Sequence, residues 1–241
     1  MDMYKCLNIP ESCFIGNTIY KKLFYENADL STNDKSLFTD TISKITWLYC
    51  LKPETINISA YKDEVREYPE VEVIEVLLHK DYKLNRVAEI IMRTIPYPMV
   101  LIFRLECKVK FYVAHQRTNQ SDSSKNTIEE FIATDWLESD SALFAKLDIK
   151  QMRFINFYTL YSDIVDAISV YNLSVIMPID DTITGEKARE ITAKVEEIEQ
   201  KIISLRSKLH KESQFNRKME LNIEIKRLEQ NKEKLLGGDI E

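Results

Sequence analysis

Apolar residues recur with two different periods between residue 1 and residue 137. In some segments they recur every three or four positions, which is typical of an amphipathic helix, and in others they form short runs that indicate strands. The run at 99–105 is almost entirely apolar, so we expect a central strand that is covered on both faces and pairs as a hairpin with the next one. Helices are predicted at residues 17–28, 31–44 and 85–95, and strands at residues 45–51, 71–78, 99–105, 109–115 and 128–137.

This order of elements predicts an α+β domain over residues 1–178, with a mostly antiparallel sheet and flanking helices. The residues expected in its core are Trp47, Leu101, Phe103 and Val113. Segment 150–173 is apolar over a wide arc, so we expect a helix that is buried on two sides. One side would lie across the sheet, and the other would face the tail or a partner. A polar run between Pro178 and Gly185 marks the end of the domain.

Beyond Gly185 the apolar residues follow heptad spacing, which indicates packed helices. The apolar seam is interrupted at 212–216 and then resumes in a shifted register. We therefore predict an antiparallel helical hairpin, a coiled coil over residues 185–236. A continuous coiled coil with a stutter, which would dimerise in parallel, is the alternative. The seam residues are Ile191, Val195, Ile198, Ile202, Leu205 and Leu209, then Leu221, Ile225, Leu228, Lys232 and Leu235.

Composition narrows the classes of function. The chain has 33 Lys+Arg and 39 Asp+Glu, a formal charge of -6, so any contact with nucleic acid or acidic lipid needs a local basic patch. Its four glycines are too scattered for a phosphate-binding loop or a dinucleotide fingerprint. The cysteines and histidines lack zinc-site spacing, so we expect reduced thiols and no metal. Without a signal peptide or a membrane-spanning run of about 18 apolar residues, the protein is expected in the cytoplasm.

Acidic residues on and before the strand at 71–78 suggest a divergent Mg²⁺-dependent nuclease, with Asp63, Glu72 and Glu75 as the metal-binding carboxylates. A restriction-type nuclease also needs a lysine two positions after the strand carboxylate, and none stands there. Lys80 or Lys83 would have to supply it. The alternative is that these carboxylates form the solvent face of an edge strand.

A polar segment directly after a predicted core strand is a candidate binding loop, formed by His115, Gln116, Arg117 and Asn119. A rigid sheet commonly positions functional side chains at such a place. The Arg117 guanidinium would suit a phosphate or a carboxylate, which it can bind through two parallel hydrogen bonds. The alternative is that these side chains cap the strand end and satisfy the loop backbone.

Basic residues gather near the predicted turn of the hairpin, where Glu212 is the single acidic residue. They predict contact with nucleic acid or with an acidic partner surface. The alternative is an ordinary solvated face of a coiled coil. The residues are Arg206, Lys208, Lys211, Arg217 and Lys218.

Several short motifs together resemble a bacterial domain-of-unknown-function family, number 4391. The most specific is the His-Gln-Arg-Thr-Asn-Gln segment at 115–120, and others are Ile95-Pro96-Tyr97-Pro98, Thr134-Asp135-Trp136 and Gln214-Phe215-Asn216. The resemblance covers nearly the whole chain. It implies an accessory protein that is encoded beside a helicase and a DNA methyltransferase in restriction-like or phage-defence loci, and it supplies no catalytic residues.

We therefore expect a non-catalytic accessory or interaction subunit of a bacterial DNA-processing system that docks through helical surfaces. No cofactor is expected, and Mg²⁺ would be needed only by the nuclease alternative. The oligomeric state stays open, because it depends on whether the tail is a hairpin within one chain or a parallel dimer.

Overall fold

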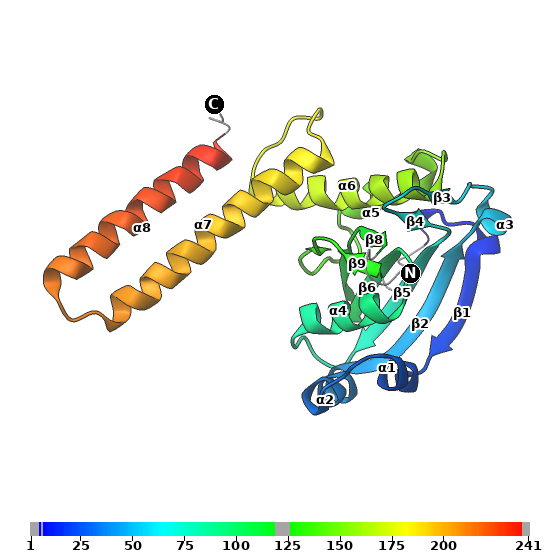
Figure 1. Cartoon of the computed structure of the whole chain (residues 1–241). Helices are drawn as coiled ribbons and strands as arrows, with labels where there is room; N and C mark the ends of the chain where they lie inside the picture. The colour runs from blue at the N-terminus through cyan, green and yellow to red at the C-terminus, as the bar shows by residue number, and fades with distance from the viewer. Residues whose placement is uncertain (1–4, 6, 119–125, 238–241) are drawn as a thin grey trace. The chain divides into compact units, whose positions relative to one another are not determined.

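A six-stranded sheet organises the first part of the chain in the computed structural model, which describes residues 5, 7–118 and 126–237 (Figure 1). The strand order is β1-β2-β5-β6-β7-β10, in which β5 and β6 are parallel and the other neighbours are antiparallel. The predicted α+β class is therefore confirmed. The strands are β1 (Phe14–Ile19), β2 (Ile42–Leu51), β5 (Val71–Leu78), β6 (Met99–Leu105), β7 (Lys108–Val113) and β10 (Ile132–Ala133).

Two small hairpins and eight α-helices complete the described part of the chain. The hairpins are β3 (Tyr61–Lys62) with β4 (Glu67–Tyr68), and β8 (Gln116–Thr118) with β9 (Asn126–Ile128). The helices are α1 (Lys21–Asn27), α2 (Thr32–Thr41), α3 (Pro53–Ile56), α4 (Leu84–Thr94), α5 (Leu143–Lys146), α6 (Phe157–Ile176), α7 (Gly185–Lys211) and α8 (Phe215–Leu236), and two 3₁₀ turns occupy Glu11–Cys13 and Ile149–Gln151.

Local signals account for the ends of two helices. Ser31 and Asp34 form a capping box at the start of α2, and α4 ends at Thr94 because Pro96 restricts the residue before it to extended backbone. Helix α2 stops three residues before the predicted end at Lys44, because the chain enters β2 at Ile42.

Two predicted elements differ from the structure, one at its start and one along its length. The first three residues of the predicted helix 17–28 are the end of β1, which pairs with β2 through Thr18 and Ile19, and helix α1 begins only at Lys21. The predicted strand 128–137 consists of β9, β10 and an isolated bridge at Leu137. In both places the backbone hydrogen-bonds to a strand that is distant in sequence, and local periodicity does not detect such a partner.

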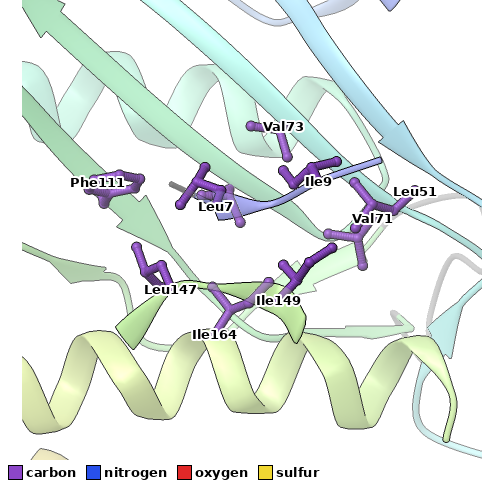
Figure 2. A pocket seen from close by; sticks show the side chains of 10 residues that line it. Leu7, Ile9, Leu51, Val71, Val73, Phe111, Leu147, Ile149 and Ile164 are labelled. Carbon is purple, nitrogen blue, oxygen red and sulfur yellow. The ribbon is translucent and has the colours of Figure 1, made fainter. Parts of the chain in front are cut away.

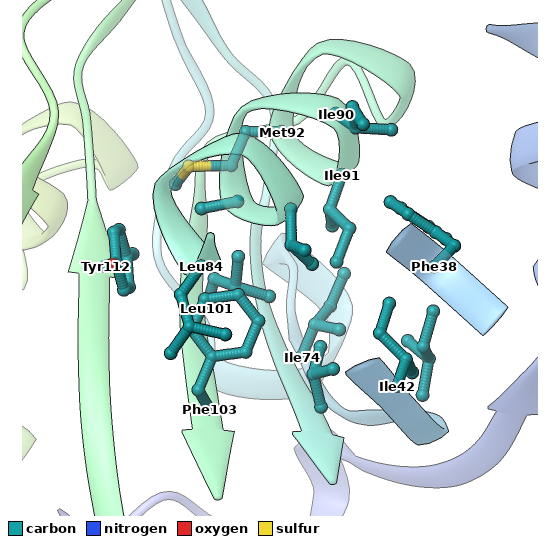
Figure 3. Packing of buried hydrophobic residues seen from close by; sticks show 14 of the residues in the cluster. Phe38, Ile42, Ile74, Leu84, Ile90, Ile91, Met92, Leu101, Phe103 and Tyr112 are labelled. Atoms are coloured by element: carbon teal, nitrogen blue, oxygen red, sulfur yellow. The ribbon is translucent and has the colours of Figure 1, made fainter. Parts of the chain in front are cut away.

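One face of the sheet packs on α4 and α2 (Figure 3). The apolar even-numbered residues of β5 from Ile74 to Leu78 and the odd-numbered residues of β6 from Met99 to Phe103 share this core with the apolar side of α4, because side chains alternate along a strand. Leu101, Phe103 and Val113 are fully buried, as predicted. Trp47 is only partly buried and packs at the margin of this core.

The opposite face of the same strands is covered by residues 7–9 and α6 (Figure 2). A small apolar cavity of about 20 Å³ lies there, lined among others by Leu7, Ile9, Val71, Val73 and Ile164 (Figure 2). Because β5 and β6 are buried on both faces, their near-continuous apolar sequence is explained, and the predicted central position of β6 is confirmed.

The chain divides into two compact units, Met1–Ile168 and Ser169–Glu241, with the division inside α6. In the second unit, α7 and α8 form the predicted hairpin, which turns at residues 212–214. Ile202, Leu205 and Ile225 are the buried centre of its apolar seam. The alternative of a continuous coiled coil with a stutter is therefore wrong for this chain, because the helix breaks at 212–214.

The last turns of α6 supply the second buried side that the sequence predicted for this helix. Leu173 is fully buried in a cluster with Ala188, Ile191 and Val195 of α7. The expected domain boundary at residue 178 lies just after α6. None of the helices in the described ranges is both long and apolar enough to cross a membrane.

Candidate functional site

The carboxylates of the nuclease hypothesis lie in three separate places. Glu72 and Glu75 point to opposite faces of β5, because they are three positions apart on an alternating strand. Strand β5 lies between β2 and β6, so the expected edge strand is wrong, and the two residues are only 3% and 8% exposed. Asp63 lies in the β3–β4 turn, where its carboxylate accepts hydrogen bonds from the backbone N–H groups of Val65 and Arg66.

The other groups that this hypothesis needs are also engaged elsewhere. Glu75 accepts a hydrogen bond from the Arg104 guanidinium of β6 at 2.8 Å, which is an ion pair within the sheet. The Nζ atoms of Lys80 and Lys83 lie 5.5 Å and 5.4 Å from the ring centre of Tyr82. The structure therefore does not assemble two carboxylates and a lysine around one position.

Glu72 instead belongs to a polar cluster with Trp47, Cys50 and Glu70. A β-bulge in β2 shifts its register with β5 by one residue after Trp47, so that Cys50 faces Glu72 directly. The extra residue places Trp47 and Cys50 on one face although three positions separate them. The Trp47 indole N–H donates to Glu72 Oε2 at 2.5 Å, and the Cys50 thiol donates to Glu70 Oε2 at 3.6 Å.

Burial controls the protonation of this cluster. Desolvation, with the charge of Glu70 as a smaller cause, raises the pKa of Glu72 to about 7. Desolvation and the charges of both glutamates raise the pKa of the Cys50 thiol to about 12. The thiol is therefore protonated at neutral pH, and Glu72 changes its charge within the physiological range.

The same cluster is the one place in the described ranges where three ligand groups of the His, Cys and carboxylate type converge. Ligand atoms of Cys50, Glu70 and Glu72 lie within 4.8 Å of one another. A thiolate with two carboxylates suits Zn²⁺ better than Mg²⁺, which prefers oxygen ligands alone. The cluster thus does not supply the donor set of a Mg²⁺-dependent nuclease.

His115 and Gln116 of the candidate binding loop are tied into the fold. His115 Nδ1 lies 2.8 Å from the hydroxyl oxygen of Tyr68. The Gln116 amide donates to the carbonyl of Tyr97 at 3.0 Å and accepts from Asn126 at 3.0 Å. These contacts support the alternative that the segment stabilises the strand ends. Its fourth member, Asn119, lies outside the described residues.

Among the described residues of this loop, Arg117 is the most exposed, with 52% of its side chain accessible to solvent. Its Nε lies 3.1 Å from Glu129 Oε1, and the same oxygen lies 2.9 Å from Nη2 of Arg66. The Arg66 guanidinium also lies over the ring of Tyr158 at 5.4 Å. Two guanidinium groups that share one carboxylate retain a net positive charge, so this part of the surface is compatible with an anion.

The basic residues of the hairpin divide into paired and unpaired ones. Arg206 pairs with Glu229 at 2.6 Å, and Arg217 lies 3.9 Å from Glu212. Three lysines within one helical turn of the connection form no ion pair with any residue that the structure describes. They are Lys208, Lys211 and Lys218.

Helix α8 also carries a line of exposed apolar side chains, here called the outer stripe, which consists of Phe215, Met219 and Ile223. Their exposed fractions are 74%, 48% and 65%. Because they are spaced four apart, they share one face of α8, and the helical period turns this face away from the seam residues Leu221 and Ile225. Sequence periodicity does not distinguish the stripe, because Met219 and Ile223 lie at the margin of the predicted seam.

Comparison with known proteins places the chain in a family. No curated protein and no solved structure matches it. One family model does match, over residues 7–231, and this range includes the whole sheet, the polar cluster of β2 and β5, and most of the hairpin. The chain therefore belongs to the DUF4391 family, which is described as a domain of unknown function.

Proposed function

We propose that this protein is a non-catalytic accessory subunit of a bacterial DNA-processing system, of the restriction-like or phage-defence type. In this proposal it docks onto a larger protein through α8. The outer stripe is the observation that carries the proposal, since exposed apolar side chains on one face of a helix are typical of a helix-in-groove contact. The resemblance described above suggests the partners, a helicase and a DNA methyltransferase encoded nearby.

The flanks of the stripe indicate the chemistry of the partner surface. Lys226 and Arg227 follow Ile223 by three and four positions, so they continue the same exposed face. A complementary surface would be an apolar groove with an acidic rim. Full burial of a large apolar side chain contributes about 1.5–3 kcal/mol, so Met219 and Ile223 together can supply a substantial part of a specific affinity.

Co-purification with the neighbouring gene products tests this proposal. We expect the tagged protein to retain one of them, and we expect Ile223→Glu and Met219→Glu to weaken the association at least tenfold, because each places a charge in an apolar contact. Ile155→Glu is a matched control, since Ile155 is also 65% exposed but lies in the other unit.

Two results would overturn the proposal. One is a protein that associates with neither neighbour, or whose association is equally weakened by the control. The other is enzymatic activity, in which millimolar Mg²⁺ raises the melting temperature and supports DNA or RNA cleavage that Glu72→Gln abolishes. The second result would establish the nuclease alternative.

A further inference from the structure

We infer that the tip of the hairpin, residues 208–218, binds a single-stranded nucleic acid through its phosphates and one base. This inference goes beyond the proposed protein contact and does not depend on it. It combines the charge of the tip, the position of that charge relative to α8, and one exposed aromatic ring.

The tip concentrates cations in a chain that is acidic as a whole. The formal net charge is -6, yet Lys208, Lys211 and Lys218 lie within one turn of the α7–α8 connection and form no ion pair within 4 Å of a described carboxylate. Glu212 is the single carboxylate of the tip, and the charges of Arg217 and Lys218 contribute to lowering its pKa. Elsewhere on α7, lysines pair with glutamates one turn away, as Lys194 does with Glu190 at 2.7 Å. The tip therefore lacks the pairing that neutralises an ordinary solvated helix face.

The position of two cations is unfavourable for the helix itself. The first turn of α8 contains Arg217 and Lys218 and no acidic residue. A helix N-terminus carries a partial positive charge, so cations there oppose the helix dipole, whereas Lys208 and Lys211 at the end of α7 are favourable. Among the described residues, Glu212 is the single carboxylate that faces both cations, so an anion bound at the tip would add a second favourable partner for them.

Phe215 favours nucleic acid over other anions. It is the first residue of α8 and is 74% exposed, and it lies four residues after Lys211 and three before Lys218 in the sequence. Single-strand-binding proteins combine a positive surface with aromatic rings on which bases stack. A duplex offers no free base face unless two base pairs are unstacked, which is costly, and three unpaired lysines supply too few phosphate contacts to offset that cost. The observations therefore favour a single strand.

Binding of a labelled single-stranded oligonucleotide to the full-length protein, followed by fluorescence anisotropy over a series of salt concentrations, tests the inference. Each phosphate contact on a single strand contributes about 0.7 to the slope of log affinity against log salt. The combined substitution Lys208→Glu, Lys211→Glu and Lys218→Glu should therefore flatten the slope by about 2. Phe215→Ala should weaken binding about 5- to 150-fold without changing the slope.

A charge-matched control is available on the same helix. Lys187, Lys194 and Lys201 are ion-paired with Glu190 or Glu197, and their combined reversal to Glu changes the net charge by the same amount. We expect this variant to keep the slope of the unmodified protein. Circular dichroism of both triple variants confirms that the hairpin stays helical, and Lys→Gln versions serve if a reversal unfolds it.

Three results would overturn the inference: no binding at low salt, equal losses in the tip and control variants, or a duplex that binds as tightly as the single strand and ignores Phe215→Ala. An acidic protein that requires the tip lysines, with no oligonucleotide bound, would likewise replace nucleic acid as the ligand. Ile223→Glu, about two helical turns from Phe215, should leave oligonucleotide binding unchanged, so this inference and the proposed protein contact can fail separately.

Discussion

Replacing the buried Glu72 by glutamine should make the first unit more stable at pH 8 than at pH 5, relative to the unmodified protein. Glu72 is 3% exposed, and burial raises its pKa to about 7. Ionisation therefore costs the folded state more than the unfolded state. Glutamine has nearly the same shape, keeps an oxygen that can accept the Trp47 indole hydrogen bond, and does not ionise.

The sign and size of the effect follow from proton linkage. A carboxyl whose pKa rises from 4.5 to about 7 on folding carries no penalty while both states are protonated. As the pH rises through this interval, the unfolded state releases its proton first, so the free energy of unfolding falls. Each pKa unit corresponds to about 1.4 kcal/mol, which gives a total loss of about 3 kcal/mol. Between pH 5 and pH 8, Glu72→Gln should therefore gain about 2–3 kcal/mol.

Urea denaturation at the two pH values, followed by tryptophan fluorescence, measures this difference. Both tryptophans, Trp47 and Trp136, lie in the first unit, so the signal reports its unfolding. A second readout is the NMR signal of the Trp47 indole N–H, which should titrate near pH 7 because it donates to the Glu72 carboxylate. Glu75→Gln is the control, because it places an amide on the other face of the same strand.

Two results would refute this reasoning. If Glu72→Gln and the unmodified protein lose stability in parallel between pH 5 and pH 8, Glu72 is not the group that titrates. If the Trp47 indole signal does not shift in that interval, the carboxylate does not change its charge there. A change of equal size in Glu75→Gln would assign the effect to the strand as a whole.

Two further predictions concern stability. Tyr161→Phe should lower the free energy of unfolding by about 1–3 kcal/mol in urea denaturation. The fully buried Tyr161 hydroxyl donates to the carbonyl of Met99 at 2.8 Å and accepts from the Ala114 N–H at 3.1 Å. A variant of unchanged stability would contradict this. Gly16→Ala should lower the melting temperature through a loss of about 1–2 kcal/mol, because Gly16 has φ +71, whereas Gly237→Ala, at a negative φ, should cost less.

The parts of the fold that sequence predicted best are those whose signal is local. Strands β5 and β6 begin and end at the predicted residues, because burial on both faces leaves a largely apolar run, interrupted in β5 by Glu72 and Glu75. The hairpin was predicted for a similar reason. The apolar seam is interrupted between Lys211 and Asn216, and the chain turns within this segment, between the end of α7 and the start of α8.

The failures share a physical cause, which is pairing with a distant strand. Ile19 has helical spacing with Leu23, yet it belongs to β1 because Ile45 of β2 pairs with it. Glu72 and Glu75 were also interpreted as the exposed face of an edge strand. In the structure, β2 and β6 pair with both edges of β5. Neither partner can be identified from residues within a few positions of the element.

The polar cluster shows why the site was harder to predict than the fold. The sequence predicted Glu72 as a candidate metal-binding carboxylate. It grouped Glu72 with Glu75, although Glu75 faces the other side of the sheet. Its actual neighbours, Trp47 and Cys50, reach it because one extra residue in β2 shifts the register. Without that bulge, strand alternation would send Trp47 and Cys50 to opposite faces, and Glu72 would lose either its indole donor or its thiol neighbour. A one-residue irregularity in a neighbouring strand therefore determines the surroundings, and with them the raised pKa, of this carboxylate.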